Sequence, residues 1–271
     1  MTSRGCLAAL WLAGCASAPR GAPDIAVVAP AASPDCAQLD PLLAGLAVDA
    51  AAAGALGLTL GLGAGERTLA GDPAADERVI AAARVTCVGG LAAALVRTDC
   101  GNATVLGFAW RGARWVPVGR LPVVAVGQPG HCVQSVVAAR PVALTLAEPR
   151  EIAVESESET DDGDEAAART LRVALLSDDG SLAWYGAAVP LGSFDPATGA
   201  ETQGRWDIIE ELPLPRDLYV EQRPLHGGLA GEPAGREIRR ETWQVRDRRL
   251  VRVDVARERV LATPPRKECP T

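Results

Sequence analysis

The first residues that could do chemistry are carboxylates beside an aromatic side chain. Asp207 directly follows Trp206, Glu210 comes shortly after, and Trp184-Tyr185 is the other concentrated aromatic pair. Paired carboxylates act as acid and base in glycoside hydrolysis. One hypothesis is therefore a hydrolase in which Asp207 and Glu210 work beside Trp206. The alternative places these aromatic rings in the hydrophobic core.

Other catalytic patterns are missing from the sequence. The two histidines are His131 and His226, and no serine stands in a G-x-S-x-G motif. Cys132 follows His131, but neighbours on a strand point to opposite faces, which disfavours a thiol–imidazole pair. No G-x-x-x-x-G-K motif occurs, and the one lysine is Lys267. We therefore expect no catalytic histidine, serine or cysteine and no cofactor, and the sequence favours a non-enzymatic protein.

An acidic cluster near the middle of the chain is a candidate for a calcium site. Asp161, Asp162, Asp164 and Glu165 supply the carboxylate oxygens that Ca²⁺ prefers, but without the alternate spacing of an EF-hand loop. Because like charges this close repel one another, the simpler interpretation is a solvated loop. We expect no metal site elsewhere.

The start of the chain has the layout of an export signal. Arg4 precedes the apolar segment 7–12, which is shorter than the roughly 20 residues that cross a bilayer as a helix. The tetrapeptide Leu12-Ala13-Gly14-Cys15 resembles the lipobox of bacterial lipoproteins, in which the cysteine is diacylated and becomes the first residue after cleavage. The resemblance implies a lipid on Cys15 and anchorage to the cell envelope. Because Ala16 follows in place of Asp, it also implies sorting to the outer membrane, facing the periplasm.

The remaining cysteines predict disulfide bonds, because an exported chain meets an oxidising compartment. With Cys6 in the signal and Cys15 lipidated, the disulfide candidates are Cys36, Cys87, Cys100, Cys132 and Cys269. None of them forms a C-x-x-C pair, which disfavours zinc. We expect a bridge within the group Cys87, Cys100 and Cys132.

The charge of the chain limits its partners. A net charge of −7 argues against binding to nucleic acid, which needs a basic surface. No basic cluster follows Cys15 to dock on anionic lipid, so the membrane connection would run through the acyl chains. The segment 236–259 is nevertheless basic, with nine arginines against five acidic residues. This segment could attract an envelope protein partner or the acidic segment 156–165.

Composition divides the chain into a series of segments. With 48% hydrophobic residues it belongs with globular proteins. The predicted segments are a signal peptide at 1–14, a flexible tether at 15–34, a half with a helix and a β-meander at 35–147, an acidic loop or linker at 148–168, a second β half at 169–263 and a tail at 264–271. The fold class is mainly β, with antiparallel hairpins and one short N-terminal helix, in one domain or two small β subdomains.

Periodicity and turn residues locate the elements. Leucines recur at three- and four-residue spacing in 35–53, which predicts one helix that is capped by Asp40-Pro41 and stopped by Gly54. Polar or glycine turns predict four hairpins, centred on residues 89–90, 111–113, 178–180 and 247–249. The segment 190–204 is expected to be a loop. In the last hairpin, Val251, Val253 and Val255 are expected to share one face.

Two hypotheses about function follow. The first is a membrane-anchored, non-enzymatic binding or assembly module of the envelope with an unknown ligand. The alternative is an envelope hydrolase that uses paired carboxylates. A hydrolase requires a cleft near Trp206 in which carboxylates converge, whereas a binding module requires an exposed apolar or charged face.

Overall fold

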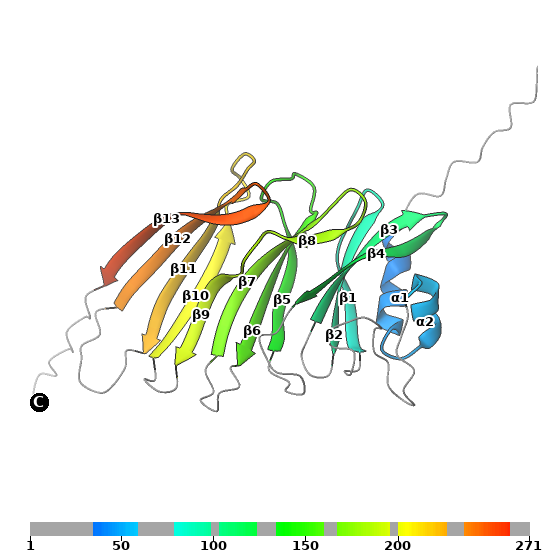
Figure 1. The fold of residues 1–271 in the computed structure, drawn as a ribbon, viewed down its shortest axis with the longest axis horizontal. Coiled ribbons are helices and arrows are strands. Elements are labelled where there is room, and N and C mark those ends of the chain that lie inside the picture. The colour runs from blue at the N-terminus through cyan, green and yellow to red at the C-terminus, as the bar shows by residue number, and fades with distance from the viewer. Residues whose placement is uncertain are drawn as a thin grey trace, which may run out of the picture. The chain divides into compact units, whose positions relative to one another are not determined.

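Two antiparallel sheets account for most of the ordered elements, so the chain is mainly β as the sequence predicts (Figure 1). The computed structural model describes residues 35–58, 79–98, 103–123, 134–159, 167–195, 200–226 and 236–260. All of these belong to one compact unit of the chain. The predicted signal peptide and tether, Cys15 included, lie outside the described residues.

In the described residues, short helices come first along the chain and strands follow. They are η1 (Cys36–Gln38), α1 (Leu39–Gly45), α2 (Ala50–Leu56), β1 (Val79–Val88), β2 (Leu91–Thr98), β3 (Ala103–Arg111), β4 (Arg114–Val123), β5 (Gln134–Val142), β6 (Glu151–Glu159), β7 (Ala167–Leu176), β8 (Leu182–Trp184), β9 (Val189–Asp195), β10 (Ala200–Ile208), β11 (Leu218–His226), β12 (Arg236–Arg246) and β13 (Arg249–Val260). In the part of the chain that the structure describes, no helix is long and apolar enough to cross a membrane.

The first sheet has four strands in the order β1-β2-β3-β4 and contains the first two predicted hairpins. Gly89 and Gly90 both have positive φ, as a two-residue hairpin turn with the twist of its strands requires. The turn between β3 and β4 likewise contains Gly112 and Ala113 with positive φ.

The second sheet has nine strands, in the order β13-β12-β11-β10-β9-β7-β6-β5, with β8 paired to β7. The predicted hairpins β7–β8 and β12–β13 are confirmed. The predicted boundary at 148–168 is wrong, because β5 already belongs to this sheet. The change of sheet falls between Val123 at the end of β4 and Gln134 at the start of β5.

The acidic loop predicted from residue 148 is replaced by strand β6 as far as Glu159. The alternation of side chains explains the error. Ile152 and Val154 are buried on one face of the strand, whereas Glu151 and Glu155 lie on the other face and find hydrogen-bond partners there. The density of negative charge suggested a solvated loop. In the structure, however, Glu151 and Glu155 both have hydrogen-bond partners within the fold.

The segment 190–204 is also a hairpin and not a loop. β9 and β10 pair through Ser193 and Thr202, and the phenylalanine at 194 pairs with Glu201. The glycine, proline and serine residues of this segment are typical of loops, so its sequence did not indicate the two strands. In the β12–β13 hairpin the register shifts at Trp243, so the pairing skips Val253. Val251 and Val255 therefore pair with Gln244 and Glu241, which lie on opposite faces of β12, and both valines are exposed. The predicted valine face is therefore wrong.

The predicted single helix is broken into η1 and two short α-helices. Asp49 is extended and its carboxylate accepts the Ala51 N–H (2.8 Å), which starts a second helix within the predicted one. Gly57 ends α2 with φ +69°. Asp40, the predicted cap, instead forms an ion pair with Arg84 of β1 (Nε–Oδ1 2.7 Å).

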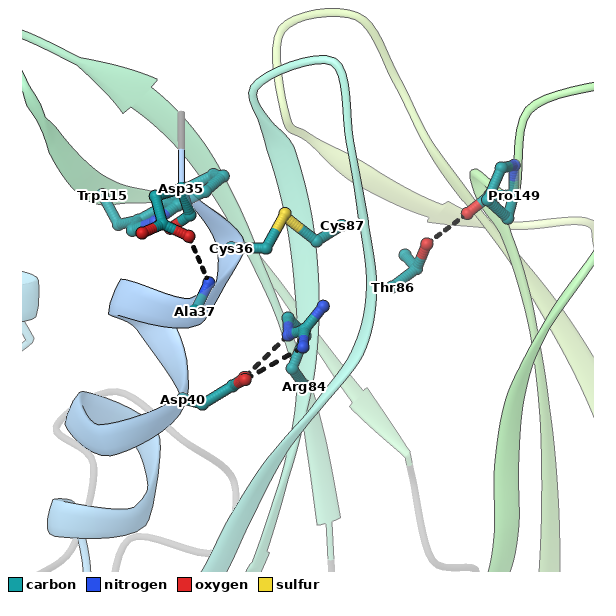
Figure 2. Close-up of a disulfide and its surroundings, with 9 residues drawn as sticks. All are labelled: Asp35, Cys36, Ala37, Asp40, Arg84, Thr86, Cys87, Trp115 and Pro149. Atoms are coloured by element: carbon teal, nitrogen blue, oxygen red, sulfur yellow. Dashed lines mark hydrogen bonds and ion pairs between the residues drawn. A yellow bond between two sulfur atoms is a disulfide. The ribbon is translucent and has the colours of Figure 1, made fainter. Parts of the chain in front are cut away.

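A disulfide fastens this helical segment to the first sheet. Cys36 of η1 bridges to Cys87 of β1, with the two Cα atoms 6.1 Å apart (Figure 2). Beside it the Trp115 indole donates to the Asp35 carbonyl (3.1 Å). A disulfide is therefore confirmed, but the expected partner for Cys87 was wrong. Cys100, Cys132 and Cys269 lie outside the described residues.

The first sheet is packed on both of its faces, and successive side chains of β3 point alternately into the two cores. Leu106 and Phe108 pack with leucines of the helices, whereas Ala103 and Val105 pack with Ile152 and strand neighbours of the second sheet. The layers are therefore helices, first sheet and second sheet. The opposite face of the second sheet holds a separate core, which includes Val142, Leu171, Val173, Tyr185, Val189, Leu218 and Leu250.

The second sheet curls around this last core. The Leu250 N–H on edge strand β13 donates to the Tyr185 carbonyl beyond β8 (2.9 Å). Arg216, between β10 and β11, donates its N–H to the Leu144 carbonyl after β5 (2.7 Å). Residues in or beside strands distant in the ladder order thus come into contact, and this curvature creates the site described next.

Candidate functional site

Trp206 of β10 is held by side chains from the far side of the curled sheet. Its indole Nε1 donates to Glu155 Oε1 of β6 (2.6 Å), and Arg169 Nη2 of β7 donates to Glu155 Oε2 (2.5 Å). The Arg140 guanidinium of β5 stacks over the Trp206 ring, with Cζ 4.0 Å from the centroid. One cation, Arg169, and the Trp206 indole thus meet at the Glu155 carboxylate, and a second cation, Arg140, covers the indole ring.

The ladder order shows how unusual this convergence is for a sheet. β5 and β10 are separated by β6, β7 and β9. In a flat sheet they would lie about 19 Å apart at the usual spacing of roughly 4.8 Å between strands. Direct contact between Arg140 and Trp206 therefore requires the curl of the sheet.

A second cluster surrounds Glu221 of β11, whose side chain is only 12% exposed. Its carboxylate receives Arg205 (3.0 Å), Arg223 (2.7 Å) and Arg240 (2.8 Å). The register places Arg205, Glu221 and Arg240 opposite one another on β10, β11 and β12. The hydrogen bond from Arg240, helped by Arg223 and Arg205, lowers the pKa of Glu221 below its usual 4.5. This glutamate is therefore an anion at neutral pH.

The two clusters border one hollow of about 500 Å³, with Gln203, Gly204 and Leu225 completing its wall. A neighbouring hollow of about 550 Å³ shares Arg205, Trp206 and Glu221. That second hollow also contains Asp207, Tyr219 and Asp254. Four arginines and two glutamates line the first hollow, so its formal charge is positive.

A further carboxylate of the second hollow is completely buried. The Glu241 side chain is 0% exposed and pairs with Arg239 and with Arg252 (3.0 Å). The Trp243 indole donates to its other oxygen (2.9 Å). Charged partners and hydrogen bonds on both oxygens satisfy the requirement for burying an ion.

The sequence matches no protein-family model and no curated protein. The geometry of these side chains is therefore the basis for interpreting the site.

The structure brings Trp206 and Asp207 to the hollows but does not bring Glu210. Asp207 is exposed and accepts the Ile208 N–H with its own carboxylate (2.9 Å). Glu210 lies exposed in the turn after β10, and among the described residues it belongs to the wall of neither hollow. The predicted pair is thus not assembled.

The other aromatic pair has a structural role. Tyr185 is buried in the core of the second sheet, and Trp184 packs against the core between the two sheets. Arg172 stacks on Trp184 at 4.4 Å. The alternative interpretation of these two rings as core residues is confirmed.

Several predicted site residues lie outside the described part of the chain. They are the lipidation candidate Cys15, the calcium candidates Asp161, Asp162, Asp164 and Glu165, and His131 with Cys132. Within the described ranges, no group of three or more His, Cys, Asp or Glu side chains could hold a metal ion.

Four of the nine arginines in the basic segment 236–259 form ion pairs among the described residues. Arg239 and Arg252 pair with Glu241, and Arg240 bridges Glu221 and Glu258. Glu241 and Glu258 are already counted among the five acidic residues of the segment, so of these pairs only that of Arg240 with Glu221 lowers the net positive charge that a partner would meet.

Sequence reasoning missed the residues that build the first hollow, namely Arg140, Glu155, Arg169 and Glu221. One signal was present for Glu155, because it alternates with buried Val154 and Ser156 in a run that was dismissed as acidic loop. The arginines that pair with Glu155 and Glu221 lie on the same strand or on a neighbouring one, whereas the contact of Arg140 with Trp206 depends on the curl of the sheet. No local pattern in the sequence encodes that contact.

Proposed function

We propose that this protein is a lipid-anchored, non-enzymatic binding module of the bacterial envelope, and that it binds through the hollows beside Trp206. The lipobox resemblance at Cys15 supports the anchor and, with Ala16 after it, an outer-membrane location facing the periplasm. The two adjoining hollows support the binding role.

One observation favours a binding module over a hydrolase: three glutamates that line the hollows are already paired with arginine. Glu155 accepts from Arg169 and Trp206, Glu221 accepts from three arginines, and Glu241 pairs with two. A general acid needs a carboxyl group that keeps its proton near neutral pH. At Glu221 the arginine partners work against this, because they lower the pKa of its carboxyl group.

The hydrolase remains the second candidate, because a hollow does border Trp206 and contains Asp207. Asp254 lines the same hollow, on β13. In the ladder Asp207 is opposite Tyr219, Tyr219 opposite Thr242, and Thr242 opposite Asp254. Three strand intervals place these carboxylates about 14 Å apart at the usual spacing, beyond the roughly 5–10 Å of glycosidase pairs.

The test is a pull-down of the tagged protein from detergent-solubilised envelope membranes, read by mass spectrometry. Arg205 is the variant position, because its side chain is 74% exposed and lines both hollows. We expect a stoichiometric partner that Arg205→Glu loses and that Arg114→Glu, at an exposed site on β4, retains.

The same preparation distinguishes the two candidates. If no partner is captured and envelope polysaccharide is cleaved by the wild type but not by Asp207→Asn, the hydrolase replaces the binding module. Capture that is equal in the wild type, Arg205→Glu and Arg114→Glu would contradict binding through the hollows.

A further inference from the structure

We propose that the first hollow beside Trp206 binds a phosphomonoester, which is carried by a free sugar phosphate or by a lipid headgroup. This inference rests on the proposed binding function and specifies its ligand chemistry.

Arg140 is the main reason for expecting an anion. Its guanidinium is fixed against the Trp206 ring at 4.0 Å. Among the described residues no carboxylate or carbonyl accepts a hydrogen bond from it, although it lines the hollow. A guanidinium stacked on an aromatic face keeps its N–H donors at the edge, arranged as a planar fork that matches phosphate oxygens.

The other arginines of the hollow also retain donors. Arg205 and Arg223 both contact the same oxygen of Glu221, Oε1, so neither guanidinium is saturated by it. Arg169 uses Nη2 for Glu155, and its Nε is buried with no hydrogen-bond partner among the described groups. Each of these four arginines therefore has hydrogen-bonding capacity beyond its internal pair.

The charge of the hollow favours a doubly charged group. Four arginines against two glutamates leave a formal excess of two positive charges. A phosphomonoester has a charge of about −1.5 to −2 at pH 7, whereas a carboxylate or sulfate ester has one negative charge. A volume of about 500 Å³ is within the usual range for small-molecule sites and has room for a sugar or headgroup beside the phosphate.

The experiment is isothermal titration calorimetry of the full chain carrying Cys15→Ser, with glucose phosphate and glucose sulfate as matched probes. We expect glucose phosphate to bind more tightly than glucose sulfate. Arg140→Gln should weaken phosphate binding by about tenfold or more, the loss typical of one charge-assisted hydrogen bond. Arg114→Gln, at an exposed position on β4, should leave the affinity unchanged.

Vesicles distinguish the source of the phosphate. Phosphatidic acid presents a phosphomonoester and phosphatidylglycerol a phosphodiester, both in a phosphatidylcholine background. Sedimentation with phosphatidic acid vesicles that Arg140→Gln abolishes supports a headgroup ligand, and binding of glucose phosphate alone supports a free sugar phosphate.

Two results would overturn the inference. One is the absence of binding to both glucose phosphate and phosphatidic acid, and the other is unchanged binding in an Arg140→Gln protein whose circular dichroism matches the wild type. A captured envelope partner together with either result would leave the proposed function standing and remove only the phosphomonoester.

Discussion

Gly107 of β3 lies so close to Gly180 that a Cβ atom on Gly107 would stand 2.3 Å from the Gly180 carbonyl oxygen. Gly107 pairs across the strands with Gly119 of β4, where a Cβ would lie 2.9 Å from the same oxygen. The two glycines form a notch in the first sheet that admits the turn between β7 and β8. Gly180 itself has φ +85°, which disfavours any residue with a side chain.

We therefore expect Gly107→Ala to destabilise the fold, because backbone atoms of one sheet must move away from the other. The expected loss is about 1–3 kcal/mol, the usual cost of overpacking a core. Urea unfolding followed by circular dichroism measures it. Gly54→Ala in α2 is the matched control: its Cβ meets no atom within 4 Å. There the change should stabilise by about 0.5–1 kcal/mol. Equal midpoints for the two variants would contradict the notch.

The disulfide should contribute strongly to stability because Cys36 and Cys87 are 51 residues apart in sequence. Closing a loop of that length restricts the unfolded chain by about 4 kcal/mol in the chain-entropy model. The double variant Cys36→Ser with Cys87→Ser should therefore unfold at a clearly lower urea concentration than the oxidised wild type. If the two unfold together, the bridge is absent from the mature protein.

Tyr185 should be important for a buried carboxylate. Its hydroxyl donates to Glu151 Oε1 (2.7 Å), and Glu151 is 0% exposed. Burial raises the pKa of Tyr185, so its hydroxyl keeps its proton and continues to donate through mildly alkaline pH. Removing the donor in Tyr185→Phe should cost about 1–3 kcal/mol of unfolding free energy. Tyr219→Phe, whose hydroxyl makes only a 3.5 Å contact to Asp217, should change little in the same assay.

The cluster around Glu221 predicts a specific pH dependence. Its arginine partners lower the carboxyl pKa below the usual 4.5, so the folded state favours the ion. The resulting stability is present above the unfolded-state pKa and is lost as the pH falls through the lower folded-state value. Glu221→Gln should therefore cost about 1 kcal/mol at neutral pH, because its partners are solvent-exposed. The difference between variant and wild type should disappear in strong acid; a constant difference from neutral to acid pH would exclude this electrostatic origin.

The anchor is tested separately from the fold. Cys15→Ser removes the thiol that the lipobox resemblance marks for acylation. We expect the variant to leave the membrane fraction, with the wild type carrying lipid by mass spectrometry. A wild type without acyl chains, and a variant that still sediments with membranes, would show that another interaction holds the protein there.

Local patterns in the sequence were sufficient for the four predicted hairpins, but not for β9–β10. Gly89-Gly90 and Asp178-Asp179-Gly180 mark turns whose backbone requires glycine, and the strands beside them follow. The prediction of a loop was wrong for Glu151–Glu159, because it rested on the number of charges and not on the alternation of buried and polar residues. The predicted helix failed at Asp49, where a capping residue begins a new helix inside a continuous leucine stripe.

The site could not be derived from local patterns. Arg140 meets Trp206 only because the second sheet curls, and that curl depends on the packing of its whole inner core. The pairing of Cys36 with Cys87 likewise could not be derived from local patterns, because it depends on where the helical segment packs against the first sheet. In both cases the contact is between residues far apart in the chain.

The position of the Cys36–Cys87 bridge has a mechanical consequence. Tension that arrives from the N-terminal side of Cys36 passes through the sulfur atoms directly into β1, whose backbone is paired to β2. The polypeptide between the two cysteines, which includes α1, α2 and β1 as far as Thr86, is bypassed. These helices have seven residues each, too few to persist without their packing partners. In a chain held at Cys15, a pull on the anchor would therefore reach the β1–β2 hairpin at Cys87, beside its turn, and the short helices would carry no tension.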